Sequence, residues 1–160
     1  SELPFGSLRR RGLLVSEVEG HQVHQQALDQ NPLGFSRDFR TLLEWGANQP
    51  QSKIDAAYAD IRAAGARFQT LMKGVDVLVL PTAPQGPFRF EAQTPANQAD
   101  FTAIANMAGC PAVAVPATPN GAPPASIQFI AKPDGDHLAL RAAAIFEAKR
   151  GPAPRPPAYF

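Results

Sequence analysis

The segment VDVLVL at residues 75–80, stopped by Pro81, decides the fold class of this chain. Asp76 is its only polar residue, and β-branched valines alternate with the remaining positions. A half-exposed strand alternates polar and apolar side chains, and this segment does not. It therefore predicts a strand that is covered on both faces, as in α/β proteins.

Two further strands are predicted after it. Residues 111–116 (PAVAVP) form a second short apolar strand, and a helix from Asp100 to Ala108 separates it from the first. Such a strand–helix–strand unit predicts two parallel strands. A short connection with a turn at 120–121 leads to a third strand at 125–131, which we expect to pair antiparallel with the second. The prediction is an α/β fold with helices packed on a mixed, partly parallel sheet.

The remaining helices are predicted from apolar periodicity and capping residues. Residues 12–28 form a helix weakened by an internal glycine, and Ser36 caps a short helix that ends near residue 46. A long apolar stripe at spacings of three and four predicts a helix over 52–73, capped by Ser52. Asp136 caps the last helix. Residues 1–150 are interpreted as part of a single domain, and 151–160 as a Pro-rich, extended or disordered tail.

Composition narrows the function classes. The chain has 160 residues, is 44% hydrophobic and 18% charged, and carries a net charge of +1. These values favour a globular protein and suggest neither a nucleic-acid nor a membrane partner. The basic run at residues 9–11 is interpreted as a solvated loop. No apolar run approaches the roughly 20 residues that span a bilayer. Cys110 is the single cysteine, which favours a reducing, cytoplasmic location.

No nucleophile stands out in the sequence. None of the six serines lies in a Gly-rich turn that could donate an oxyanion hole. Each lysine is explained by a helix end or a strand end, and Cys110 by a small buried apolar site. We therefore assign no catalytic residue to this chain and expect no cofactor.

A metal site is the one other chemistry that the sequence suggests. His21 and His24 lie three residues apart on a predicted helix, and Glu17 lies one turn before His21. Two imidazoles and a carboxylate on one face can bind a divalent metal. No HExxH motif accompanies them, so ordinary polar helix positions are the favoured interpretation and we expect no metal.

Several segments together resemble the carboxy-terminal region of amidase-signature hydrolases. They are VDVLVLPTAP at 75–84, FTAIANMAGCPAVAVP at 101–116 and APPASIQFIAK at 122–132, preceded by GFSRDFRTLLEWG at 34–46. The likeness extends from about residue 12 to residue 148. Their order and spacing are specific as a set, whereas each piece alone is only an apolar strand or helix.

The resemblance implies a serine hydrolase of the α/β/α amidase fold that acts on carboxylic amides through an acyl-enzyme. In that family a Gly-Gly-Ser-Ser-Gly-type signature and an upstream lysine supply the Ser-Ser-Lys triad. Neither is present in these 160 residues. The resemblance therefore implies a substrate-side fragment, inactive alone, that needs a missing amino-terminal amidase portion.

The resemblance also suggests which residues face a small amide substrate. They lie after the first strand and at the start of the following helix: Thr82, Ala83, Phe101, Thr102 and Asn106. Thr82 and Asn106 can instead satisfy backbone groups at a strand end and a helix end.

The two apolar strands lack neighbouring strands in this chain to pair with their edges, which also predicts a homo-oligomer. The alternative function is a non-catalytic interaction module on the same half-fold.

Overall fold

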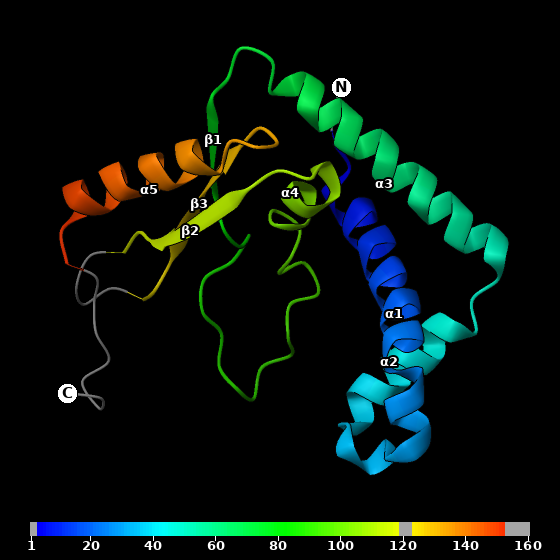
Figure 1. Cartoon of the computed structure of the whole chain (residues 1–160). Helices are drawn as coiled ribbons and strands as arrows, with labels where there is room; N and C mark the ends of the chain where they lie inside the picture. Colours follow the sequence, from blue (N-terminus) through cyan, green and yellow to red (C-terminus); the bar gives the residue numbers. More distant parts are fainter. Residues whose placement is uncertain (1–2, 119–122, 153–160) are drawn as a thin grey trace.

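The computed structural model describes residues 3–118 and 123–152. A helical arm lies on one side of the molecule, a small sheet with one helix lies on the other, and a short helix joins them (Figure 1). In chain order the elements are α1 (Phe5–Gln30), η1 (Pro32–Gly34), α2 (Arg37–Ala47), α3 (Gln51–Leu71), β1 (Val77–Pro81), α4 (Ala103–Ala108), β2 (Ala112–Pro116), β3 (Ser126–Ala131) and α5 (Asp136–Arg150).

The α/β class is confirmed, but the sheet is arranged differently from the prediction. Its strand order is β1-β3-β2, and β3 pairs antiparallel with both neighbours. The first and second strands therefore run in the same direction, as expected, without being hydrogen-bonded to each other. The predicted antiparallel pairing of the second and third strands is confirmed. Insertion of β3 between them makes every pairing in the described sheet antiparallel, so the predicted parallel pairing is wrong.

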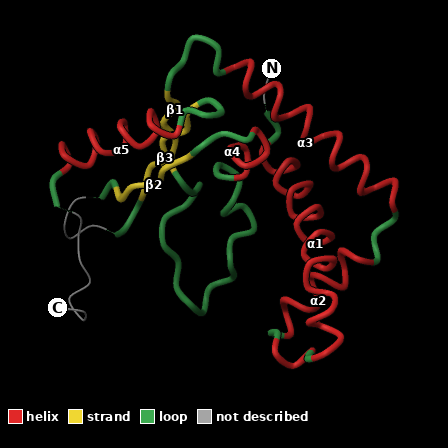
Figure 2. Tube along the Cα trace, in the orientation of Figure 1, coloured by secondary structure: helices red, strands yellow, loops and turns green. Residues whose placement is uncertain are grey.

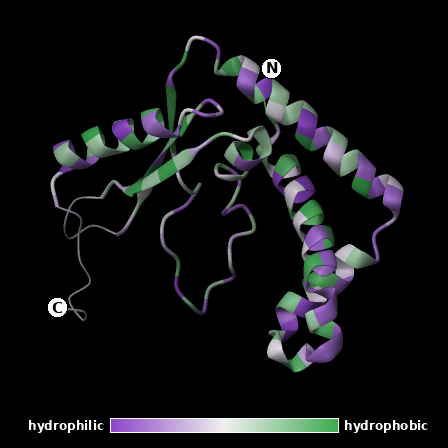
Figure 3. Ribbon diagram, in the orientation of Figure 1, coloured by the Kyte–Doolittle hydropathy of each residue, from purple (hydrophilic) through white to green (hydrophobic). Residues whose placement is uncertain are grey.

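Different helices pack against the two faces of the sheet. The first strand was predicted to be covered on both faces, but no residue of β1 is fully buried and Val79 is 49% exposed. Phe129 and Val115 face α5, where they contact Ala143 and Phe146. On the opposite face, Ile130 joins a core built from α1, α3 and α4. Figure 3 shows that the strands are largely hydrophobic, whereas the helices carry hydrophilic residues along their length. The sheet thus lies between two apolar cores and contributes side chains to both.

Close helix packing holds the arm together. A Cβ added at Gly20 of α1 would lie 2.8 Å from Leu43 of α2, and one at Gly46 would lie 2.6 Å from the backbone of Glu17. Gly20 therefore permits a close contact, and α1 continues through it over Phe5–Gln30. The predicted helix at 12–28 was too short, mainly at its start, because buried Leu8 and the ion pair of Arg9 with Asp100 hold the earlier turns in place.

The structure corrects four local predictions. Residues 9–11 lie within α1 and not in a solvated loop. Ser52 does not cap α3, since the cap position is Pro50. Asp100 and Asp136 do not cap their helices either: Asp100 pairs with Arg9, and Asp136 lies in the first turn of α5.

Other predicted signals are confirmed. The Ser36 hydroxyl accepts a hydrogen bond from the Phe39 amide at 3.2 Å and caps α2. Gly109 ends α4 with φ of 62°, a left-handed conformation that favours glycine. The predicted turn at 120–121 lies outside the described residues, as does the tail from residue 153 onward.

Gly65 gives a direct test of the α3–α4 contact. Replacing Gly65 with Ala should lower the free energy of unfolding by about 1–3 kcal/mol, because the new methyl group would lie 2.5 Å from the Met107 carbonyl oxygen. In an unconstrained helix the same change would raise stability by about 1 kcal/mol. Gly86→Ala is the control, since a Cβ there meets nothing within 4 Å. Urea unfolding distinguishes them, and an unchanged midpoint for Gly65→Ala would contradict the packing.

Candidate functional site

A cavity of about 450 Å³ lies where β1 and β2 end and β3 begins. Ala83 lines it together with Pro81, Gln85, Ala114 and Ser126. We call it the strand-end cavity. Strand ends and the loops that follow them are the usual ligand sites of α/β folds. The loop that leaves β1 here is long, extending away from the sheet before it returns to α4 (Figure 2).

Thr82 lies between two residues that line this cavity. Its amide donates a hydrogen bond to the Ser126 carbonyl oxygen at 3.0 Å, which ties the loop to β3. The Thr82 hydroxyl is buried and has no hydrogen-bond partner among the residues that the structure describes. The same holds for the side-chain carbonyl of Gln85. Buried polar groups of native proteins are almost always paired, so this loop has unused hydrogen-bonding capacity.

The other predicted site residues lie just before α4 or within it. Phe101 packs its ring edge-on against Phe5, with centroids 6.0 Å apart. Thr102 is partly buried, and its hydroxyl donates to the Ala99 carbonyl oxygen at 3.4 Å. Asn106 is exposed, and its backbone carbonyl accepts a hydrogen bond from the Gly109 amide. None of these three residues lines the strand-end cavity itself.

Gln128 joins the two groups of predicted residues, and it was not predicted from the sequence. It is 2% exposed, and its side-chain amide donates to the carbonyl oxygens of Pro81 at 3.2 Å and Phe101 at 2.9 Å. One signal was available: a glutamine in the middle of the otherwise apolar strand segment IQFI. A buried polar side chain of this kind needs partners, but its partners are far away in the sequence.

Arg9 and Asp100 form a second connection that was not predicted from the sequence. The guanidinium Nε of Arg9 lies 2.7 Å from the Asp100 carboxylate, and the two side chains are 13% and 17% exposed. The pair holds the end of the long loop against α1. Charge-assisted hydrogen bonds of this kind are short and strong when they are shielded from water.

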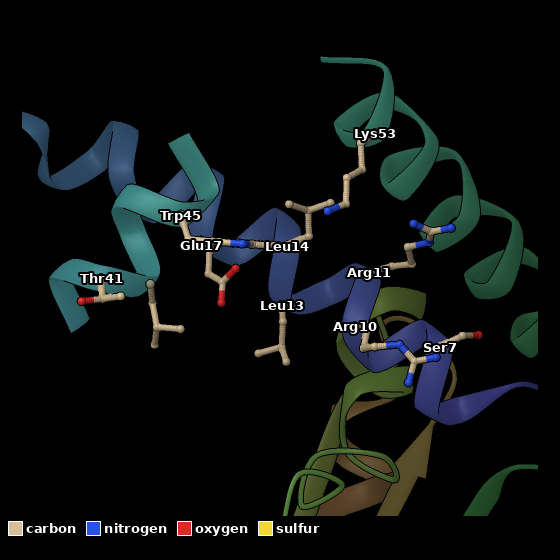
Figure 4. Close-up of a pocket in the computed structure, with 10 residues that line it drawn as sticks. Ser7, Arg10, Arg11, Leu13, Leu14, Glu17, Thr41, Trp45 and Lys53 are labelled. Atoms are coloured by element: carbon tan, nitrogen blue, oxygen red, sulfur yellow. The ribbon is translucent and has the colours of Figure 1, made fainter. Parts of the chain in front are cut away.

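A larger cavity of about 650 Å³ lies among α1, α2 and α3. Figure 4 shows Leu13 and Glu17 projecting from α1, Trp45 from α2 and Lys53 from α3. The Lys53 ammonium lies 4.8 Å from the centroid of the Trp45 ring. Burial raises the pKa of Glu17, and the charge of Lys53 opposes this shift. We call this the helix cavity; it combines apolar walls with a charged rim.

Two residues considered for nucleophilic or metal chemistry, Cys110 and His24, are buried or packed against aromatic rings. Cys110 is buried, and burial raises the pKa of its thiol, which disfavours the reactive thiolate. His24 packs edge-on against both Phe35 and Phe39, with centroids 5.7 Å away. Over residues 3–118 and 123–152, no group of three His, Cys, Asp or Glu side chains is arranged to hold a metal ion. No helix in that part of the chain is long and apolar enough to cross a membrane.

Comparison with known proteins relates this geometry to a family. The Amidase family model matches residues 14–140. A glutamyl-tRNA(Gln) amidotransferase subunit of Thermus thermophilus is 37% identical over 149 residues, which cover 89% of this chain and 31% of that protein. Thus the chain spans about a third of the length of this curated relative.

Solved structures share the fold. A crystal structure of an amidase superposes with a TM-score of 0.81 at 22% identity, covering 94% of this chain and 37% of that one. A bacterial aryl acylamidase of the amidase-signature family gives a TM-score of 0.71 at 15% identity, with 91% and 34% covered. Because the family model matches most of the residues and the relative from Thermus matches nearly all of them, this chain belongs to the amidase family.

Proposed function

We propose that this chain is the carboxy-terminal, substrate-side part of an amidase that hydrolyses carboxylic amides through an acyl-enzyme. Residues 1–150 form part of one amidase domain, and a Ser-Ser-Lys triad is supplied by another stretch. The proposal depends on one combined observation about the sequence. The chain matches the amidase family over residues 14–140, yet it has no serine in a Gly/Ser-rich segment.

The exposed edges of the sheet support the proposal that another part of the amidase pairs with them. Within the described sheet, β1 and β2 each pair on one side only, with β3. Val79 of β1 is 49% exposed, and Ala112 and Ala114 of β2 are also exposed. Edge strands with unpaired backbone groups and apolar side chains favour pairing with another chain segment. A larger amidase sheet would supply such segments.

The unpaired polar groups beside the strand-end cavity support a substrate-facing role. The buried Thr82 hydroxyl and the Gln85 carbonyl lack partners among the described residues. An amide substrate offers both a donor N–H and an acceptor carbonyl. In this proposal Thr82 and Ala83 line the acyl side of the site, while Phe101, Thr102 and Asn106 form its second side. The compartment is the cytoplasm, where the lone Cys110 stays reduced.

The catalytic assignment is tested by labelling and by reconstitution. The 160 residues alone should neither hydrolyse aryl or aliphatic amides nor react with a fluorophosphonate probe. Joined to the remainder of the Thermus thermophilus relative, of which they match 31%, they should restore both activities, with the label on the added segment. The remainder alone serves as the control. Stoichiometric labelling of a serine in the isolated chain would overturn the proposal, and a folded but inert chimera would favour the interaction module.

Thr82 provides a test with opposite effects on stability and activity. Thr82→Val removes a buried hydroxyl that lacks a partner among the described residues, so the isolated chain should keep or slightly gain stability. In the active chimera the same change should lower kcat/KM by about tenfold through loss of a substrate hydrogen bond. Ser36→Ala is the matched control, since loss of that helix cap should cost about 1 kcal/mol without lowering kcat/KM. Equal activity of Thr82→Val and the parent would remove Thr82 from the site.

The exposed strand edges predict self-association of the isolated chain, as dimers or larger oligomers, at micromolar concentration. Val79→Lys places a charge on the edge strand β1 and should shift the chain toward monomer. Leu140→Lys is the control, because Leu140 is similarly exposed, at 58%, but lies on α5 and not in an edge strand. Analytical ultracentrifugation measures both. A parent chain that sediments as a stable monomer is incompatible with this part of the proposal.

A further inference from the structure

We infer that Gln128 is a positioning residue that sets the separation of the two segments proposed to line the substrate site. The inference rests on the proposed function for the role of those segments. It does not depend on that function for the restraint itself, which is a property of this chain.

The location of Gln128 requires its side chain to find partners inside the protein. It lies in the middle of β3, opposite Leu80 on one side and Ala114 on the other. Only 2% of its surface is exposed, so water cannot satisfy its amide. An unpaired amide buried in this way would lose its hydrogen bonds to water without replacement. The side chain is therefore held by whatever accepts its hydrogens.

Its two acceptors lie at opposite ends of the long loop at 82–102. The amide nitrogen donates at 3.2 Å to the carbonyl oxygen of Pro81, the residue before Thr82. It donates at 2.9 Å to the carbonyl oxygen of Phe101, the residue before Thr102. One NH₂ group thereby uses both of its hydrogens to bridge the end of β1 and the start of α4. A shift of either segment breaks one of these bonds.

The other restraints hold each segment to a different part of the molecule. The Thr82 amide binds the Ser126 carbonyl oxygen on β3. Asp100 is held by Arg9 of α1, and the Phe101 ring by Phe5 of α1. The first segment is thus tied to the sheet and the second to the helical arm. Apolar packing of α4 on Leu80 and Ile130 also brings the two segments together, but it is not directional. Gln128 adds a direct hydrogen-bonded link, whose length and geometry fix the distance across the site.

The chemistry of the bridge makes glutamine difficult to replace. Methionine has a similar length but donates no hydrogen bond. Glutamate has nearly the same shape, but when ionised it presents oxygens toward two carbonyl oxygens. When protonated, it regains one donor. The three side chains therefore predict different behaviour of the loop ends.

Hydrogen exchange of single amides in the full 160-residue chain tests the restraint. In Gln128→Met, the protection of the Thr82 and Ala103 amides should fall by about tenfold, since each lies next to a released segment. The Met72 amide, bonded to Phe68 in α3, should be unchanged. Phe129→Leu is the matched control: it weakens the neighbouring contact with α5 on the opposite face and leaves the Gln128 bonds intact.

Gln128→Glu adds a signature that general destabilisation does not produce. Protection of the Thr82 and Ala103 amides should be low at pH values where the carboxyl is ionised and recover as the pH falls and the carboxyl gains its proton. Neither the parent nor Gln128→Met should show this recovery, once rates are corrected for intrinsic exchange. Unchanged protection in Gln128→Met, or equal loosening by Phe129→Leu, would overturn the inference.

The consequence for catalysis is measured in the active chimera described above. Gln128→Met should raise KM and lower kcat, whereas Phe129→Leu should leave both near the parent values. Absence of turnover in the parent chimera counts against the proposed function alone, since the exchange measurements still decide the restraint. Loosened loop ends with unchanged kcat and KM would show that the restraint does not position a substrate site.

Discussion

Strand β3 is paired on both sides, and the rest of the described structure is arranged around it. Antiparallel ladders to β1 and β2 use its backbone groups in both directions. Its alternating side chains then serve two cores at once, with Phe129 facing α5 and Ile130 facing α3 and α4. Because the register of a strand decides which side chains reach each face, a slip by one residue would exchange these contacts and also turn Gln128 away from its partners.

Polar interactions occur where the helical arm meets the sheet. Arg9 binds Asp100 across the boundary, and Gln128 reaches from the sheet to the carbonyl oxygen of Phe101. Apolar packing alone tolerates small sliding movements, whereas a buried hydrogen bond weakens steeply as its distance and angle depart from their preferred values. Directional bonds at this joint therefore define the orientation of α4 more sharply than the surrounding core does. The residues proposed to face the substrate lie beside these bonds.

Sequence patterns were sufficient for the elements that depend on near neighbours. The apolar runs at 75–80 and 111–116 predicted strands, the Ser36 cap predicted the start of α2, and Gly109 predicted the end of α4. They were insufficient where the decisive contact is remote. The position of β3 between two strands that run in the same direction depends on contacts between segments far apart in the sequence. The helical placement of residues 9–11 depends on partners such as Asp100, which lies 91 residues from Arg9. The site residues came from a family resemblance, and Gln128 was missed because its acceptors are backbone atoms, which leave no pattern in the sequence.

Polar side chains are hydrogen-bonded where the sheet meets the helical arm, whereas two of them lack a partner at the strand-end cavity. At the joint with the helical arm, the partly buried side chains of Arg9 and Asp100 and the buried side chain of Gln128 find partners within the chain. At the strand-end cavity, the hydroxyl of Thr82 and the carbonyl of Gln85 do not find one among the described residues. The other unpaired buried side-chain atoms in that part of the chain are arginine nitrogens at scattered positions, whereas these two oxygens lie three residues apart, beside unpaired strand edges. A cost of on the order of 1–3 kcal/mol for each such group is readily explained if a substrate or a neighbouring segment completes the hydrogen bonds. The strand-end cavity, where hydrogen-bonding groups lack partners among the described residues, is thus also where amide chemistry is proposed to occur.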